Sequence, residues 1–237
     1  MIDRSYLKDL AASLGVSLDD RALERFDLYA QLLCDWNKKI NLTAITDPQE
    51  ICVKHFADSL SVLAKVEVPQ NAKLIDVGTG AGFPGLALKI ARPDLHVTLL
   101  DSTKKKLTVL ENISRKLELD VKLLHMRAEE AGQDSAYREQ FDIATARAVA
   151  NLAVLVEYCL PFVRVGGRFL AMKSAKTQEE LTGAKKAIGT LGGKLRKIHT
   201  LQLAAAGERT ILEMEKISPV PAVYPRPSAK IARDPLG

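Results

Sequence analysis

The chain lacks the long apolar segments that cross membranes. One of its longest apolar runs, residues 152–156, is far shorter than the ~20 residues that a membrane-spanning helix needs. The first residues, Met1 to Ser5, also lack the basic start and apolar stretch of a signal peptide. We therefore expect a cytoplasmic protein.

Cysteine is scarce, with three residues in 237. Cys34, Cys52 and Cys159 lie far apart, and no two of them have the CxxC spacing of a metal or redox motif. Separated cysteines in an odd number argue against a disulfide framework and against a zinc site. We expect reduced thiols that pack as small apolar side chains, and no metal.

The overall composition is that of a folded globular protein. Hydrophobic residues make up 47% of the chain and charged residues 27%, which argues against disorder. The length allows one large domain, or one domain with an appended subdomain. The net charge of +5 suggests an anionic partner but does not identify it.

Apolar residues recur at helical spacing through the first part of the chain. After Ser17 they follow at steps of three and four, and they are Leu23, Phe26, Ala30, Leu33, Trp36 and Ile40. A second helix is predicted to begin with Asp47 as its N-cap and Pro48 in its first turn. Residues 1–70 are therefore expected to form a helical N-terminal extension.

Between residues 71 and 217, short apolar runs alternate with amphipathic segments. Strands are predicted at 73–77, 96–100, 121–125, 141–146, 168–173, 194–202 and 209–216, and helices at 84–91, 104–117, 151–160 and 177–188. This alternation indicates an α/β fold with βαβ units and a mostly parallel sheet. The short turn at 204–208 favours an antiparallel final strand. The tail, residues 218–237, is rich in proline and basic residues and is expected to be extended.

A glycine-rich loop follows the first predicted strand of this region. The strand ends at Val77 and leads directly into Gly78-Thr79-Gly80-Ala81-Gly82, and a helix is predicted from Pro84. Glycines allow the backbone to turn tightly and to approach a ligand closely. In an open α/β sheet such a loop lies at the ligand-binding crevice. Gly78 and Gly80 are therefore candidate cofactor-binding residues.

Two carboxylates accompany this loop and narrow the choice of cofactor. Asp101 ends the second strand, where a carboxylate can accept hydrogen bonds from ribose hydroxyls. Asp76 lies just before the loop, where it would repel a pyrophosphate and attract an ammonium group. S-adenosylmethionine carries an ammonium group and no phosphate, so Asp76 favours it over a dinucleotide.

Further candidates follow the later strands. After the third strand, Ala128 and Glu129 could flank an adenine, although Glu129 could equally be a solvated acid at a helix start. Arg147 places a cation at the end of the fourth strand among apolar neighbours, and Lys173 closes the fifth strand. Arg147 and Lys173 are candidate crevice cations, and no catalytic residue is assigned.

The residues after the fourth strand restrict the methyl acceptor. The segment from Ala146 to Val149 lacks the Asn/Asp-Pro-Pro-aromatic motif used on adenine amines, and Cys159 falls within a predicted helix instead of the crevice. A lysine-centred base cluster for ribose is not evident. A nucleophilic acceptor such as guanine N7 needs no base, so positioning and exclusion of water could suffice.

Basic residues between the prolines of the tail suit a phosphate backbone. Arg226 is therefore a candidate RNA contact, and Asn41 and His55 in the N-terminal extension are others, although a lone histidine more often serves packing.

Taken together, these motifs resemble one family, the bacterial 16S ribosomal RNA guanine-N7 methyltransferases called RsmG or GidB. The matching stretches span most of the chain, and they are residues 36–45, 54–60, 75–85, 100–102, 127–129, 146–148 and 224–226. At 227–230 the chain departs from the glycine-containing basic segment with which the family often continues its tail.

The resemblance implies a Rossmann-like class I methyltransferase fold and S-adenosylmethionine contacts at Gly78, Phe83, Ala128, Glu129 and Arg147. It also implies methylation of guanine N7 in 16S ribosomal RNA, with the small ribosomal subunit as the setting in which the RNA is met. Two alternatives stay open on the residues alone. One is a methyltransferase for another RNA, a small molecule or a protein, and the other is a non-catalytic nucleoside-binding regulator.

Overall fold

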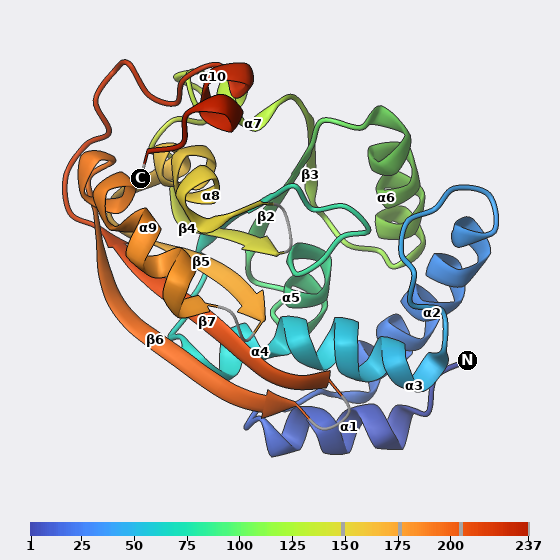
Figure 1. Ribbon diagram of the computed structural model, residues 1–237. Coiled ribbons are helices and arrows are strands. Elements are labelled where there is room, and N and C mark those ends of the chain that lie inside the picture. The colour runs from blue at the N-terminus through green and yellow to red at the C-terminus, as the bar shows by residue number, and fades with distance from the viewer. Residues whose placement is uncertain (148–149, 175–176, 204–205, 237) are drawn as a thin grey trace.

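The computed structural model describes residues 1–147, 150–174, 177–203 and 206–236, and within them the strands form one sheet (Figure 1). The strands are β1 Lys73–Val77, β2 His96–Asp101, β3 Lys122–His125, β4 Phe141–Arg147, β5 Val163–Ser174, β6 Gly193–Leu203 and β7 Gly207–Lys216. Their order across the sheet is β3-β2-β1-β4-β5-β7-β6. Strands β1 to β5 are parallel, and β7 lies antiparallel between β5 and β6. The predicted mostly parallel sheet with an antiparallel last strand is therefore confirmed.

This strand order creates a crevice at the carboxyl edge of the sheet. The chain leaves β1 toward β2 on one side, and it later returns to place β4 on the other side of β1. Connections that follow β1 and β4 therefore run to opposite sides, and a ligand can enter between them. The glycine loop after β1 and Arg147 at the end of β4 both lie at this point.

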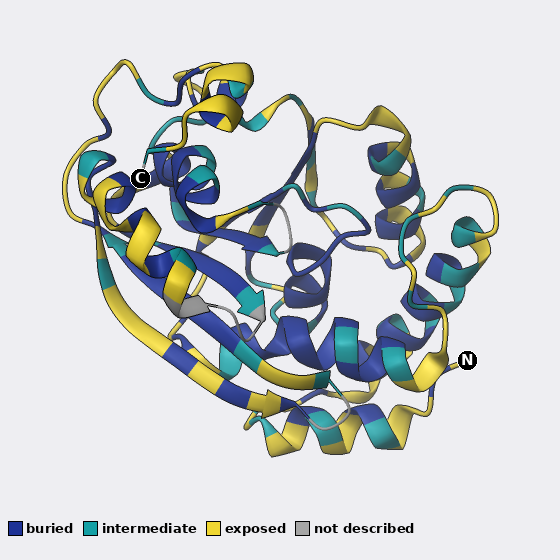
Figure 2. Ribbon diagram, in the orientation of Figure 1, coloured by how far each residue is buried: buried dark blue, intermediate teal, exposed yellow. Residues whose placement is uncertain are grey.

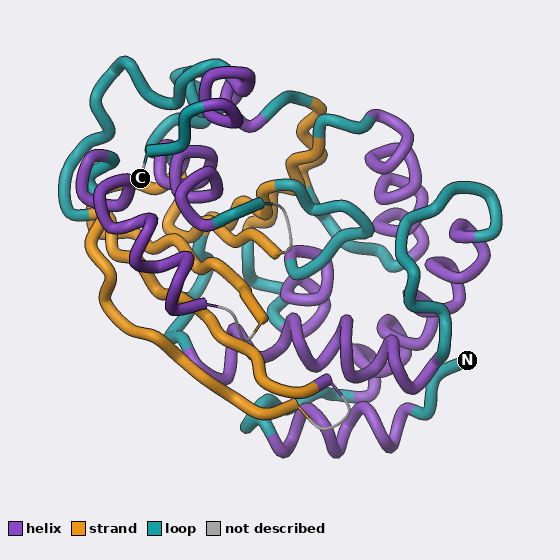
Figure 3. The backbone as a smooth tube through the Cα atoms, in the orientation of Figure 1, coloured by secondary structure: helices purple, strands orange, loops and turns teal. Residues whose placement is uncertain are grey.

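Helices cover both faces of the sheet (Figure 3). Those of the N-terminal part are α1 Arg4–Ser13, α2 Asp20–Asn37, α3 Pro48–Glu50, the π-helix η1 Ile51–Ala57 and α4 Asp58–Lys65. Those of the sheet region are α5 Gly85–Ala91, α6 Lys104–Lys116, α7 Ala128–Ala131, α8 Leu152–Cys159, the 3₁₀ turn η2 Leu160–Phe162 and α9 Thr177–Thr190. Every one of them is too short or too polar to cross a membrane within the residues that the structure describes.

The N-terminal helices share a core with one face of the sheet. Phe26 of α2 and Phe56 of η1 belong to the same buried cluster as Leu86 of α5 and Leu107 of α6. The opposite face packs against α8 and α9 in a second cluster. Figure 2 shows this burial along the inward faces of the helices and through the central strands. The N-terminal extension thus contributes to the core of the molecule and can support the residues that line the crevice.

The predicted helix starts are partly confirmed. The Asp47 side chain accepts a hydrogen bond from the Glu50 amide, with Pro48 in the first turn, as the sequence indicates. Helix α2, which follows Ser17 as expected, is capped by Asp19, whose carboxylate accepts a hydrogen bond from the Ala22 amide. The helix after Asp47 winds as a π-helix from Ile51, which periodicity alone does not distinguish from an α-helix.

Two other expectations need correction. Strand β5 begins at Val163, five residues before the predicted start at Arg168. Gly166 and Gly167 interrupt the apolar pattern of the sequence, so the prediction began after them, whereas the strand continues through both glycines. The tail is not extended throughout, since Ser228–Arg233 form helix α10. Of the predicted turn at 204–208, residues 204–205 lie outside the described part, and Gly207 already belongs to β7.

Candidate active site

The glycine loop turns sharply at the end of β1 and lines a cavity. Gly78 has a φ of 71°, a left-handed conformation that glycine adopts readily. Gly82 has a φ of 99°, and a Cβ atom there would lie 2.5 Å from the Tyr29 hydroxyl. The amides of Gly78 and Thr79 both donate to the Leu100 carbonyl, which fixes the loop to the end of β2. The loop therefore has a defined shape without a ligand's help.

Asp76 holds this loop from inside the protein. Its carboxylate is fully buried and accepts hydrogen bonds from the Thr79 hydroxyl at 2.7 Å and the Gly85 amide at 2.9 Å, with the Thr145 hydroxyl at 3.3 Å. Burial raises the pKa of Asp76 to about 6. The sequence-based expectation placed this carboxylate beside a ligand's ammonium group. In the structure this carboxylate joins the loop to the start of α5, and its contact with a ligand stays a prediction.

The first cavity, of about 370 Å³, lies between the ends of β1, β2 and β3. Its lining residues are Val77, Gly78, Leu100, Asp101, Ser102, Thr103, Lys106, Met126, Arg127, Ala128, Glu129 and Tyr158. Four of the predicted cofactor residues are among them, namely Gly78, Asp101, Ala128 and Glu129. Gly80 is not, but its amide donates to the Asp101 carboxylate at 3.0 Å and so orients it.

The chemistry of this first cavity fits an adenosine-containing cation. The Asp101 and Glu129 carboxylates can accept hydrogen bonds from hydroxyl or ammonium groups. Asp101 is held in place because it also accepts from the Thr103 amide at 2.8 Å. Sequence reasoning missed Lys106, whose ammonium lies 3.9 Å from Asp101, and Tyr158 on α8. The position of Lys106 one turn into α6 after Asp101 was a usable signal, whereas Tyr158 reaches the cavity only through the fold.

Phe83 lies in a stack of rings that joins the loop to the N-terminal helices. Its ring stacks on His55 at 4.4 Å and on Tyr29 at 5.1 Å, measured between ring centroids. The Tyr29 hydroxyl donates to the Ala81 carbonyl at 2.6 Å. Phe83 is buried and its ring packs behind the loop, outside the lining of the first cavity, and the cofactor contact that the resemblance implies for this residue stays a prediction.

A second cavity, of about 440 Å³, lies next to the loop at the ends of β4 and β5. It is lined by Ile45, Lys54, His55, Asp58, Ser61, Arg147, Met172, Lys173, Glu180, Arg209, Thr210 and Ile211. Three candidates from the sequence, His55, Arg147 and Lys173, thus come together here. Asn41 is exposed in the loop before α3 and does not line this cavity.

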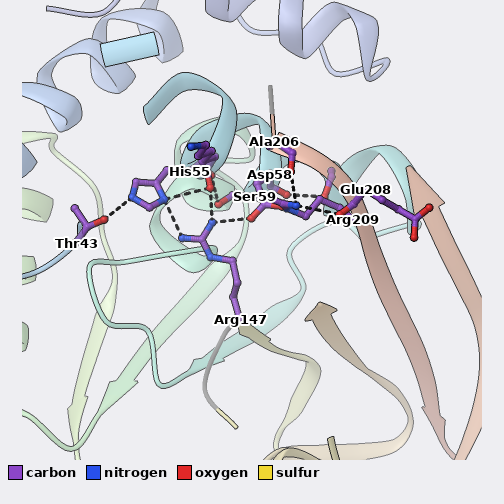
Figure 4. Close-up of polar contacts among 10 residues, drawn as sticks. Thr43, His55, Asp58, Ser59, Arg147, Ala206, Glu208 and Arg209 are labelled. Carbon is purple, nitrogen blue, oxygen red and sulfur yellow. Dashed lines mark hydrogen bonds and ion pairs between the residues drawn. The ribbon is translucent and has the colours of Figure 1, made fainter. Parts of the chain in front are cut away.

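Arg147 is held on several sides in the second cavity (Figure 4). Its guanidinium donates to the Asp58 carboxylate at 2.8 Å and to the Lys54 carbonyl at 3.1 Å, and it lies 3.3 Å from the His55 Nδ1 atom. It also lies over the Phe83 ring, 5.0 Å from its centroid. Arg147 therefore connects this cavity to the glycine loop. Ala148, which follows it in the sequence motif, lies outside the described residues.

His55 is a neutral part of this network. Burial, followed by the charge of Arg147, lowers its pKa to about 4. Its Nδ1 atom lies 3.3 Å from the Arg147 guanidinium and 3.2 Å from the Lys54 carbonyl, and its Nε2 atom lies 2.9 Å from the Thr43 hydroxyl. His55 thus orients Arg147 without adding a charge.

We predict that His55 makes the fold less stable as the pH falls from 6.5 to about 4. The unfolded chain, with the ordinary pKa of 6.5, binds a proton more readily than the folded protein does. Stability is therefore complete above the unfolded value and is lost as the pH falls through the folded value, by on the order of 3 kcal/mol. Urea unfolding of the wild type and of His55→Asn across this range measures the effect.

The comparison with His55→Asn is needed because Asp76 acts in the opposite direction. Its pKa is raised to about 6, so its protonation in the same range stabilises the folded state and partly cancels the effect of His55. The difference in unfolding free energy between wild type and variant isolates the histidine. A difference that stays constant across the range would contradict the prediction.

Arg226 does not provide the free cation that the sequence suggested. Its guanidinium forms two hydrogen bonds to the Glu157 carboxylate, at 2.7 and 2.8 Å, and Glu157 is fully buried. Arg138 binds the same part of the tail through the carbonyls of Val220 and Tyr224. The tail is thus attached to α8 through Glu157, the residue before Tyr158 of the first cavity.

The strand order, the glycine loop and the carboxylates of the first cavity define a class I methyltransferase that uses S-adenosylmethionine. A family model, described as GidB, rRNA small subunit methyltransferase G, matches residues 22–212. The chain belongs to this family.

Full-length relatives agree with this assignment. "Ribosomal RNA small subunit methyltransferase G" of Brevibacillus brevis is 47% identical over 96% of this chain and 97% of its own length. The protein of the same name from Bacillus subtilis is 47% identical over 95% of each chain. Among solved structures, an S-adenosylmethionine-dependent O-methyltransferase of Thermotoga maritima is similar in fold, with a TM-score of 0.52 and 14% identity, over 78% of this chain and 72% of that one.

Proposed function

We propose that this enzyme methylates N7 of a guanine in 16S ribosomal RNA. The observation that carries the proposal is the second cavity, which is lined by Lys54, Arg147, Lys173 and Arg209 and is connected to the glycine loop because Arg147 and His55 pack against Phe83. Each of these cations is paired with a carboxylate of Glu50, Asp58 or Glu180, so the cavity offers oriented polar groups that suit the edges of a nucleobase. The names of the relatives, which specify the RNA of the small ribosomal subunit, support the same substrate.

The chemistry of guanine N7 agrees with the residues of the second cavity. When bound, S-adenosylmethionine supplies an activated methyl group on its sulfonium. N7 has a lone pair and no proton, so this chain does not need to provide a base. His55, the histidine of the cavity, is neutral and already engaged with Thr43 and Arg147. The residues then act by orienting the base and by excluding water.

The parts of the chain take different roles in this proposal. Residues 71–217 form the methyltransferase domain, and Gly78, Asp101, Ala128 and Glu129 hold the cofactor in the first cavity. Residues 1–70 support the glycine loop through Tyr29 and His55. Residues 218–237 attach to α8. The RNA is met within the small ribosomal subunit in the cytoplasm, and no metal ion is needed because N7 requires no activation.

Transfer of a labelled methyl group tests the proposal. Small subunits and deproteinised 16S RNA, both from a strain lacking the enzyme, are incubated with the protein and methyl-labelled S-adenosylmethionine. We expect label in 16S RNA at one guanine, and strand cleavage specific for 7-methylguanine maps it. Label at another atom, or only in protein or small molecules, would refute guanine N7 as the acceptor. An absence of transfer would favour a nucleoside-binding regulator.

A further inference from the structure

We propose that Asp58 selects guanine by accepting hydrogen bonds from the Watson–Crick edge of the target base. This inference rests on the proposed function, because it concerns the base whose N7 receives the methyl group. Asp58 begins helix α4 directly after the π-helix η1, and its side chain lines the second cavity. A carboxylate in a cavity dominated by cations calls for a specific explanation.

The Asp58 carboxylate is held between two guanidinium groups. Its Oδ2 atom lies 2.8 Å from Nη1 of Arg147, and its Oδ1 atom lies 3.2 Å from Nε of Arg209 (Figure 4). Only 7% of the side chain is exposed. The two positively charged guanidinium groups thus compensate the negative charge of this carboxylate, whose burial would otherwise cost free energy.

The two arginines are themselves fixed by other contacts. Arg147 is bound to the Lys54 carbonyl and lies over the Phe83 ring. Arg209 donates to the carbonyls of Ala206, at 2.6 Å, and Glu208, at 3.0 Å. The carboxylate therefore has a fixed orientation before any substrate enters, which lowers the entropic cost of recognition.

Asp58 retains acceptor capacity after these two ion pairs form. An ionised carboxylate has about four lone-pair sites, two on each oxygen. Arg147 contacts Oδ2 and Arg209 contacts Oδ1, so each arginine uses one site and leaves one site on that oxygen. The second acid of the cavity, Glu180, is held through one oxygen only, because its Oε2 atom accepts from both the Lys173 ammonium at 2.7 Å and the Leu152 amide at 2.9 Å. Asp58, held through both of its oxygens, is thus the more rigidly oriented of the two, and it is the one that contacts Arg147 next to the ring of Phe83.

Guanine is the base whose edge matches such a carboxylate. Its N1–H and N2–H₂ groups are adjacent donors, and they lie on the side of the ring opposite N7. Adenine and cytosine present a ring nitrogen acceptor in the corresponding place, which a carboxylate repels. Bases that are taken out of a helix are read in this way, through hydrogen bonds to their Watson–Crick edge. The negative charge also favours the base as it becomes cationic on methylation.

Inosine in place of the target guanosine gives a direct test. Inosine keeps N7, N1–H and O6 and lacks only the N2 amino group. We expect the wild type to methylate small subunits carrying guanosine about 10- to 100-fold faster than those carrying inosine, since a hydrogen bond to a charged acceptor is lost. Asp58→Asn should methylate guanosine more slowly, with a guanosine-to-inosine ratio near one. Glu180→Gln serves as the control, because it should lower both rates equally.

The outcomes separate this inference from the proposed function. Transfer to guanosine by the wild type with equal rates on inosine would overturn the role of Asp58 and leave the proposed function intact. An unchanged ratio in Asp58→Asn would show that Asp58 merely anchors its arginines. Asp58→Glu keeps a carboxylate for both arginines and should therefore retain a preference for guanosine. If this variant lost the preference, that result would also count against the inference. Failure of the wild type to methylate guanosine would instead refute the proposed function.

Discussion

Replacement of Gly78 by aspartate is expected to abolish binding of S-adenosylmethionine while the protein stays folded. Gly78 lines the first cavity with a φ of 71°, a conformation that aspartate tolerates better than most residues. The new side chain would occupy the cavity and add a third carboxylate near Asp101 and Glu129. We expect affinity to fall by at least ~100-fold, or about 3 kcal/mol, in calorimetric titration.

The matched control is Gly15→Asp. Gly15 has a φ of 77° in the turn after α1, and a Cβ atom there would meet open space. It therefore imposes the same backbone strain far from the crevice, and we expect nearly wild-type affinity and a similar thermal midpoint. Unchanged cofactor affinity in Gly78→Asp would refute the assignment of the first cavity.

Replacement of Arg226 by alanine is expected to lower the free energy of unfolding by about 3–5 kcal/mol. The reason is that Glu157, which is fully buried on α8, would lose the guanidinium that compensates its charge. Urea unfolding followed by circular dichroism measures this loss. Because Glu157 precedes Tyr158 of the first cavity, weaker S-adenosylmethionine binding should accompany it.

Two further variants decide between a structural role and an RNA contact for Arg226. Arg233→Ala removes an exposed cation of α10 and should leave stability unchanged within about 0.5 kcal/mol. The double variant Glu157→Met with Arg226→Met removes both charges and should recover much of the stability lost in the single variant. If Arg226→Ala instead weakened RNA binding without lowering stability, the tail would be an RNA contact, as the sequence alone suggested.

The order of helices and strands was largely readable from the sequence because it depends on local patterns. Alternating apolar runs predicted each of the seven strands, and only β5 differed by more than two residues at its start. The glycine loop and Asp101 were recognisable for the same reason, since a loop and an acid at the ends of adjacent strands follow from chain order. Helix α10 was missed because prolines on both sides obscured six residues of helical pattern.

The roles of individual charged residues were much less predictable. Asp76 was read as a ligand contact, yet the structure points its carboxylate toward Thr79 and Gly85. Asp58 lies in one of the stretches that resemble the family but was assigned no role, and Arg209 was not singled out, although the two form an ion pair in the second cavity. Whether a charge is free or compensated depends on partners that only folding brings near.

The sequence by itself determined the class of this protein and the position of the loop where we propose that its cofactor binds, because the glycine loop and Asp101 follow from local backbone geometry and strand order. Only the tertiary structure decided which charged residues line a cavity and which are paired inside the protein. Arg226 and Glu157 are 69 positions apart in the chain, and their contact turns an expected RNA-binding cation into an internal support. Burial makes such pairing obligatory, since an uncompensated charge in the interior is costly, and no local pattern records which partner meets it.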